Sequence, residues 1–192
     1  LLIYENGAIT EDIYRNIAGH IPERSMLVFN QTKVVNARLL FRKPSGGIIE
    51  VFCLAPGPAY ADIQSAMLQK NAVEWECLVG GAGKWKPGMV LQLVHESPHF
   101  TLTAKIISRN PSAFILKLEW DNELLTFAEV LHFAGKVPLP PYLHREAEAA
   151  DERTYQTTYA RDEGSVAAPT AGLHFTPEIF HSLSEKKIPT SF

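Results

Sequence analysis

The sequence is poor in cysteine and has no long apolar run. Its 192 residues include only two cysteines, and nothing in it approaches the roughly eighteen consecutive apolar residues of a membrane-spanning helix. Cys53 and Cys77 each lie inside an apolar, strand-like run, which is typical of reduced core residues in a cytoplasmic protein. A single disulfide between them is the alternative. We therefore expect a cytoplasmic protein without a membrane span.

The chain also lacks an excess of positive charge, with 18 Lys and Arg against 21 Asp and Glu and a formal net charge of −3. A protein that binds RNA over its whole surface is usually basic, so RNA binding here would need a local patch. The candidate clusters are Arg38, Arg42 and Lys43, the triplet Lys84-Trp85-Lys86, and Arg145, Arg153 and Arg161. Taken singly, each cluster is better interpreted as solvated surface charge.

Common nucleotide and metal motifs are missing as well. No Gly-x-Gly-x-x-Gly occurs, which removes motif support for a dinucleotide fold. Residues 80–84 resemble a phosphate loop, but Trp85 takes the place of its Ser or Thr and the segment joins two predicted strands. His95 and His99 are separated by Pro98 in a predicted turn, so they cannot act as a helical ligand pair. We expect no metal site.

What the chain does contain is a block of alternating sequence in residues 45–120. Five strand-like runs stand there between turn residues, at Ile48–Leu54, Val73–Val79, Met89–Val94, Phe100–Ile107 and Phe114–Trp120. Alternation with a period of two over several short runs predicts a small antiparallel β-barrel or sandwich.

The flanking sequences have mixed character. Before the block, we expect a strand, a helix and two strands at Leu1–Tyr4, Glu11–Ala18, Met26–Asn30 and Lys33–Leu40. After it, helices are expected over Leu124–Ala134, with Asp121 or Asn122 as its cap and Gly135 as its stop, and over residues 177–187. The sequence thus predicts a two-domain fold of mixed α and β structure. An α/β domain of residues 1–40 plus 121–192 carries the motifs, and an all-β barrel of residues 45–120 is inserted into it.

Gly164–Thr176 is the most informative segment. Its Gly, Ala and Ser residues bury little apolar area, which argues against a packed core element. Thr176-Pro177-Glu178 is typical of a helix start, with a capping hydroxyl, a proline in the first turn and an acid at the positive end of the helix dipole. The backbone here can approach a ligand closely, with His174 as the ionisable side chain. The alternative is a tight turn that lets two elements pack.

Two further clusters suggest ligand contacts. Asn30, Thr32, Lys33 and Arg38 follow a buried-looking strand, where α/β folds place binding residues, and the two cations suit a carboxylate or a phosphate. The alternative is a polar turn between strands. Tyr155, Gln156, Thr157 and Tyr159 offer hydrogen bonds and stacking to an adenine ring or an unstacked base. The alternative is a strand whose two tyrosines lie in a core.

Several segments in a fixed order resemble one family. They are Val28–Val34, Ala37-Arg38-Leu39, Leu139-Pro140-Pro141-Tyr142, Asp151, Tyr155–Ala160 and Gly164–Thr176. This order resembles the S-adenosylmethionine:tRNA ribosyltransferase-isomerases of queuosine biosynthesis over essentially the whole chain, and least in residues 55–120. Members of that family are about twice as long. The resemblance therefore implies that this chain is an internal fragment, or the ordered part, of a longer protein.

The resemblance implies an enzyme that is both a transferase and an isomerase. It moves the ribosyl part of S-adenosylmethionine onto 7-aminomethyl-7-deazaguanine in a tRNA anticodon, and adenine and methionine leave as epoxyqueuosine forms. The implied partners are tRNA and S-adenosylmethionine. The reaction requires a base for the acidic proton beside the sulfonium, a proton donor for adenine and a pocket that excludes water. Because the sulfonium is itself the activating group, no cofactor is needed.

Within that reaction, His174 is the first candidate for acid–base work, because an unperturbed imidazole titrates near neutrality. The alternative is a hydrogen-bonded structural histidine that fixes the glycine-rich turn. The residues expected to bind substrate are Asn30, Thr32, Lys33, Arg38, Tyr155, Gln156, Thr157, Ser165, Pro169, Thr170, Ala171, Gly172 and Thr176.

Two other functions remain open. The barrel of a non-catalytic module would bind RNA by itself, and a family paralogue would keep the scaffold but take another RNA substrate. The small and polar residues concentrate in 30–38 and 155–176, outside the predicted barrel, which favours a small-molecule pocket over the binding module.

Overall fold

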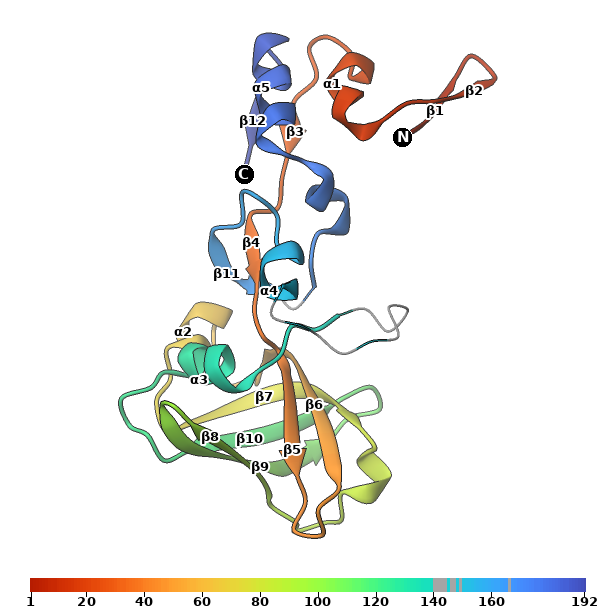
Figure 1. The fold of residues 1–192 in the computed structure, drawn as a ribbon. Helices are drawn as coiled ribbons and strands as arrows, with labels where there is room; N and C mark the ends of the chain where they lie inside the picture. Colours follow the sequence, from red (N-terminus) through yellow and green to blue (C-terminus); the bar gives the residue numbers. More distant parts are fainter. Residues whose placement is uncertain (140–144, 146–147, 149, 166) are drawn as a thin grey trace.

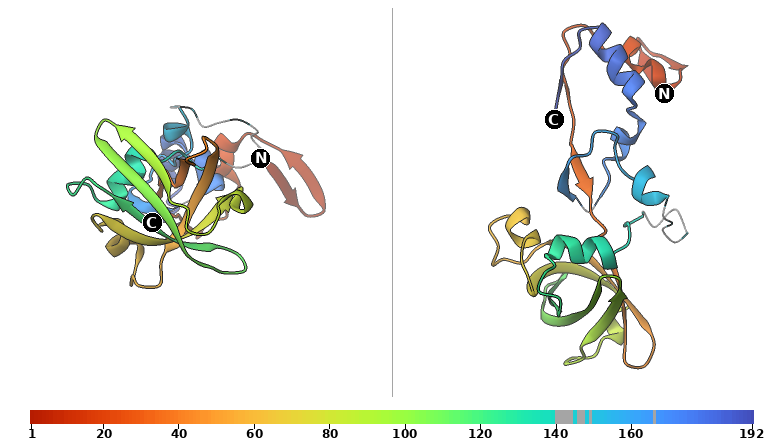
Figure 2. Two further views of the ribbon diagram at one scale, coloured as in Figure 1. Left: turned by 90° about the horizontal axis from the view of Figure 1, so that it is seen from below. Right: turned by 60° about the vertical axis from the view of Figure 1, so that its left-hand side comes forward.

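The computed structural model describes residues 1–139, 145, 148, 150–165 and 167–192. A β-barrel forms one end of the molecule, and short strands and helices lead away from it to the end where both chain termini lie (Figures 1 and 2). Pro140, Pro141 and Tyr142 of the Pro-rich connector lie outside the described residues, as does Val166 of the glycine-rich segment.

Six antiparallel strands close the barrel in the order β10-β7-β6-β5-β8-β9. They are β5 (Arg38–Arg42), β6 (Ile48–Pro56), β7 (Ala72–Gly80), β8 (Leu91–Glu96), β9 (His99–Arg109) and β10 (Phe114–Trp120). The alternating sequence correctly predicts five of them. The sixth, β5, overlaps the end of the flanking strand expected at Lys33–Leu40. It closes the barrel because Leu39 and Phe41 are fully buried opposite Val51 and Ile49 of β6.

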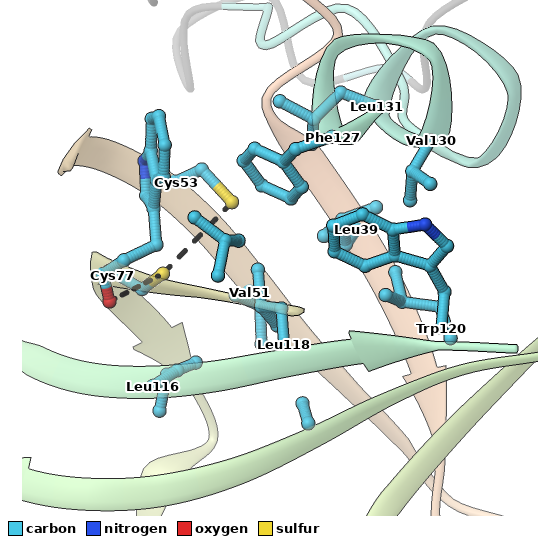
Figure 3. Close-up of a cluster of buried hydrophobic side chains, with 14 of the residues drawn as sticks. Leu39, Val51, Cys53, Cys77, Leu116, Leu118, Trp120, Phe127, Val130 and Leu131 are labelled. Carbon is cyan, nitrogen blue, oxygen red and sulfur yellow. Dashed lines mark hydrogen bonds between the residues drawn. The ribbon is translucent and has the colours of Figure 1, made fainter. Parts of the chain in front are cut away.

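Helix α3 (Phe127–Ala134) covers one opening of the barrel. Its Phe127 packs on Trp75 of β7 with ring centroids 4.8 Å apart, and Val130 and Leu131 belong to the same buried cluster (Figure 3). The helix expected at Leu124–Ala134 therefore shares a core with the barrel strands. The short helix α2 (Ile63–Met67) contributes Ala66 and Met67 to this core, and the segment η2 (Ala82–Lys84) joins β7 to β8.

The start of α3 corrects one expectation and its end confirms another. Thr126, and not Asp121 or Asn122, caps the helix. Its hydroxyl accepts a hydrogen bond from the Glu129 N–H at 3.4 Å, and the Glu129 carboxylate accepts one from the Thr126 N–H at 2.8 Å. Gly135 ends the helix as predicted, and its N–H donates to the Leu131 carbonyl at 2.9 Å.

The two cysteines face each other across β6 and β7. Cys53 and Cys77 are register partners, both are free thiols, and their sulfur atoms lie 4.0 Å apart (Figure 3). Burial raises the pKa of the Cys77 thiol well above its ordinary value. The structure therefore agrees with reduced core cysteines.

The N-terminal region differs from the expected strand and helix. A hairpin of β1 (Leu2–Glu5) and β2 (Ala8–Glu11) comes first, turning at Asn6 and Gly7 with φ values of 50° and 84°. An Asn-Gly pair is a strong hairpin signal. The helical part begins only afterwards, as η1 (Tyr14–Asn16) and α1 (Ile17–His20), so the helix expected at Glu11–Ala18 is wrong in its bounds.

Two parallel strand pairs connect the early and late parts of the chain. β3 (Leu27–Val28) pairs with β12 (Thr190–Ser191), and β4 (Thr32–Val34) pairs with β11 (Asp162–Ser165). Between them come α4 (Asp151–Thr154), η4 (Thr170–His174) and α5 (Pro177–Glu185). A second core, separate from that of the barrel, holds Ala18, Phe175, Ile179, Leu183 and Ile188. No helix within the described ranges is both long and apolar enough to cross a membrane.

Candidate functional site

A pocket of about 680 Å³ lies where the chain after α3 meets the barrel strands β5, β6 and β7. Its lining combines an ion pair, aromatic rings and aliphatic side chains, contributed by Arg38, Glu50, Phe52, Leu78, Val79, Gly80, Pro138, Leu139, Tyr155 and Ala167. Arg38 and Tyr155 are residues that the sequence predicts for a binding site, and they come from segments more than a hundred positions apart. An apolar pocket with a few convergent polar groups is the usual form of a small-molecule site.

Arg38 is the main charged group of this pocket. Its Nη2 donates to Glu50 Oε2 at 2.7 Å, and its backbone pairs in both directions with Lys136, at 3.2 and 2.8 Å. The Nε atom is buried and has no hydrogen-bond partner among the described residues. A guanidinium has five donors, so the Glu50 pair leaves donors that can receive a carboxylate or a phosphate. Tyr155 lies half-buried at the other wall.

Gln156 holds the strand that leads into the barrel. Its side-chain oxygen accepts from the Val34 N–H at 2.9 Å, and its side-chain nitrogen donates to the Val34 carbonyl at 2.7 Å. Both ends of the amide are therefore engaged in positioning β4. Asn30 accepts from both the N–H and the hydroxyl of Thr32, at 2.9 and 2.7 Å, in a turn just before that strand. Lys33 follows and is exposed.

The glycine-rich segment is tied to the neighbouring chain. The Val35 N–H donates to the Ser165 carbonyl at 2.9 Å, and the Gly172 N–H donates to the Pro169 carbonyl at 2.7 Å within η4. A Cβ atom on Gly172 would collide with the Tyr159 hydroxyl and lie 3.0 Å from Thr157 Cγ2. At this glycine, the close approach is therefore between two parts of the chain. Thr157 is buried beneath it, while Thr170 and Ala171 are exposed.

His174 lies at the end of η4, outside the lining of the Arg38 pocket. Its exposed ring is 4.9 Å from the ring of Tyr14, centroid to centroid, and no described residue forms a hydrogen bond to it. Thr176 occupies the N-cap position of α5, but its side chain makes no capping bond, contrary to expectation. Its hydroxyl instead bonds to Glu178, which lowers the pKa of that carboxyl.

The predicted residues therefore form two groups. Arg38 and Tyr155 share the pocket on the barrel side, and η4 with His174 lies next to Tyr14 and the second core. Gln156, Thr157 and Tyr159 lie between these groups in the chain. Tyr159 packs on Phe29, with centroids 5.1 Å apart, so its ring belongs to a core and does not offer a stacking surface.

Sequence reasoning gave no role to Glu50 or Asp151. Glu50 is recognised only through the register of β5 and β6, which places it diagonally across from Arg38. Asp151 is 5% exposed and accepts two bonds from Arg145, at 2.6 and 2.7 Å, and one from the Glu148 N–H at 2.8 Å. These bonds, with Arg145 first, lower the pKa of Asp151 from 3.8 to about 2. The neighbouring sequence carries no spacing signal for this pair.

Replacing Asp151 with asparagine is expected to destabilise the protein at neutral pH. The folded-state pKa lies below the ordinary value of 3.8, so the ionised carboxylate stabilises the fold above about pH 4. That contribution is lost as the pH falls through about 2, where the wild type and the variant should converge. Urea unfolding followed by circular dichroism across this range measures the difference. Glu152→Gln on the same helix is the control, and a wild-type-to-D151N gap that does not change with pH would contradict the assignment.

The comparisons with known proteins bear on the whole chain. The model of a family described as "Queuosine biosynthesis protein" matches residues 1–192. A relative named S-adenosylmethionine:tRNA ribosyltransferase-isomerase from Pelobacter propionicus is 36% identical over 192 residues, which is all of this chain and 50% of the relative. One of the same name from Thermus thermophilus is 36% identical over 197 residues, covering all of this chain and 51% of its own length.

A crystal structure titled S-adenosylmethionine tRNA ribosyltransferase, from Thermotoga maritima, aligns with 96% of this chain and 44% of its own at 22% identity and a TM-score of 0.34. The chain spans about half the length of the curated relatives it matches. Since the family model covers every residue and the relatives exceed a third in identity, the family is settled. The chain belongs to the queuosine biosynthesis protein family.

Proposed function

We propose that the protein carrying this chain transfers and isomerises the ribosyl part of S-adenosylmethionine onto 7-aminomethyl-7-deazaguanine in the anticodon of tRNA. The products are epoxyqueuosine-tRNA, adenine and methionine. The observation that carries the proposal is the match of the family over all 192 residues, with relatives of that name at 36% identity. The pocket beside Arg38 supports a small-molecule substrate, because its lining combines apolar walls with a cation.

In this proposal Arg38 binds an anionic group of a substrate, either the methionine carboxylate or an RNA phosphate. Glu50 holds the guanidinium in place through the 2.7 Å bond to Nη2, and Tyr155 offers a ring to adenine or to an unstacked base. Asn30, Thr32 and Gln156 position strand β4 and so act on the substrate through its neighbours. Thr157 and Gly172 set the path of the glycine-rich segment that carries Ser165, Pro169, Thr170 and Ala171.

We propose His174 as the acid–base group. The absence of a hydrogen-bond partner within the described part of the chain supports this role over the structural alternative, because a histidine that fixes a turn does so through such bonds. Its exposure lets a substrate reach the ring. The sulfonium of S-adenosylmethionine activates the adjacent proton for removal, so the chemistry requires neither a metal nor a redox cofactor, and we place the reaction in the cytoplasm with tRNA.

We also propose that the chain is organised in two units. One is the barrel with α3, approximately residues 37–137, and the other is the α/β part built from the residues before and after it. The separate buried clusters support this division, as does the pairing of β4 with β11 and β3 with β12 outside the barrel. These bounds assign α3 to the barrel unit, because Phe127 and Leu131 lie in its core.

Mass spectrometry of tRNA from cells that lack the gene tests the proposed reaction. The expected result is accumulation of tRNA carrying the unmodified 7-aminomethyl-7-deazaguanine, with queuosine restored when the gene is returned. Normal queuosine content in the deleted strain would contradict the proposal. Accumulation of a different precursor would indicate a paralogue with another RNA substrate.

A further inference from the structure

Positive charge in this acidic chain is concentrated in three segments of the barrel. Residues 40–48, 80–94 and 104–118 contain seven of the 18 Lys and Arg residues and none of the 21 Asp and Glu residues. The rest of the chain is therefore strongly acidic. A polyanion that meets this protein is repelled over most of its surface and attracted to these segments.

The fold brings the three segments to one end of the barrel. The β5–β6 turn and the segment between β7 and β8 lie at the end of the barrel that points away from β4 and α4 (Figure 1). A groove of about 680 Å³ runs between residues 82–90 and the strands β9 and β10, with Lys86, Lys105 and Arg109 in its lining. A second groove of about 450 Å³ contains Arg42 and Lys43. Val90 lines both, so the two grooves adjoin.

Two cations of these segments are already neutralised. Lys105 and Lys117 both bind the carboxylate of Glu119, each at 2.9 Å. The remaining five have no carboxylate partner among the residues that the structure describes, and they form what we call the basic face: Arg42, Lys43, Lys84, Lys86 and Arg109. All but Lys43 are exposed, and Lys43 is half-buried.

The basic face rests on a fixed framework. Trp85, between the two lysines of the η2 segment, is 4% exposed, and its Nε1 donates to the Met89 carbonyl at 2.9 Å. This anchor turns Lys84 and Lys86 outward. The Arg109 guanidinium lies over the ring of Phe114, 5.2 Å from its centroid. A cation held flat on an aromatic ring can contact a phosphate and stack with a base at once.

We infer that the basic face binds the phosphate backbone of RNA, at a surface separate from the Arg38 pocket. The identification of this RNA as tRNA rests on the proposed function. Charge complementarity selects the partner, because five unneutralised cations on an otherwise acidic protein match a closely spaced row of phosphates. The backbone is held on the barrel while an unstacked base of the same RNA reaches a pocket elsewhere on the protein.

Salt-dependent binding of a fluorescently labelled tRNA transcript to the full chain, in the absence of S-adenosylmethionine, tests this inference. The test variant replaces Lys84, Lys86 and Arg109 with glutamine. The matched control removes three exposed cations elsewhere, Arg24, Lys70 and Lys187, and has the same net charge. The expected result for the test variant is at least about a tenfold weaker Kd near 50 mM salt. Its slope of log K against log salt should also fall by about 2 to 3, since each lost phosphate contact removes about 0.7 to 0.9.

The control variant should bind within about twofold of the wild type. The double variant Lys84→Gln, Lys86→Gln keeps the Arg109–Phe114 contact and should still lose about 1.5 to 2 in slope, so a folding defect in the triple variant does not decide the matter. Equal losses in test and control variants, or an unchanged slope in the test variant, would overturn the inference. So would binding of phosphatidylglycerol vesicles, and not tRNA, through these residues.

This test and the test of the proposed reaction can fail independently. Unchanged tRNA binding by the variants overturns the basic face even where deletion of the gene abolishes queuosine. Normal queuosine in the deleted strain, together with the predicted loss of slope, supports an RNA-binding face on a protein with another activity.

Discussion

Replacing Gly135 with alanine is expected to lower the free energy of unfolding by about 3 kcal/mol, at the upper end of the cost of overpacking. The added Cβ would collide with the backbone oxygen of Asn36 and lie 2.5 Å from the backbone oxygen of Leu131. Neither atom can rotate away as a side chain does. Relief requires the end of α3 to move from the segment that enters β5, where Arg38 and Lys136 pair through their backbones.

Gly83→Ala is the matched control for this substitution. A Cβ at Gly83 meets nothing within 4 Å, and the residue does not have a positive φ. Its stability should change by less than about 1 kcal/mol, and the loss of chain entropy in the unfolded state favours a small gain. Tryptophan fluorescence in urea is a suitable probe, because Trp75, Trp85 and Trp120 all belong to the barrel core. A Gly135→Ala protein with the wild-type unfolding midpoint would show that the close approach is not real.

The barrel was largely predictable because its strands bury every second residue. Val73, Trp75 and Cys77 are nearly or fully buried on β7, as their alternation indicates. Strand β5 is harder to predict, because Leu39, Leu40 and Phe41 form a continuous apolar run without alternation. Its place is set by closure of the barrel between β6 and β8, and closure depends on partners far away in sequence.

The errors outside the barrel come from local turn chemistry and from tertiary packing. The Asn6-Gly7 turn makes a hairpin of the N-terminal residues, and the expected helix is displaced toward Ile17. The amphipathic helix α3 has the pattern expected of it, but periodicity does not specify which core its apolar face covers. Phe127 fits beside Trp75, and this contact joins the helix to the barrel.

The candidate site was predictable in its parts and not in its arrangement. Arg38 and Tyr155 stand in segments that the sequence marks as polar and ligand-like, and the structure places both in one pocket. Glu50 was not predictable, since only the register of two strands brings it to Arg38. The amide of Gln156 looks free in the sequence, whereas both of its ends are bound to Val34 in the fold.

The largest effect on activity is expected at His174. If this imidazole moves the proton in the proposed reaction, alanine and glutamine at this position should each reduce kcat at least about a hundredfold, the usual scale of general acid–base catalysis. Glutamine keeps a hydrogen-bonding shape but does not titrate, so it separates proton transfer from positioning. The measurement is turnover of S-adenosylmethionine with tRNA as a function of pH, made on the active protein that carries this chain.

A purely structural His174 predicts a different pattern. Its ring contacts Tyr14 at 4.9 Å, so alanine would chiefly lower the melting temperature, and glutamine would stay nearly active with an unchanged pH profile. His181→Gln is the control, because His181 is an exposed histidine on the adjacent helix that pairs only with Glu185, at 3.5 Å. It should retain wild-type turnover. Wild-type-like turnover in His174→Gln as well would remove this residue from the mechanism, and the segment from Ser165 to Thr176 would then act in binding alone.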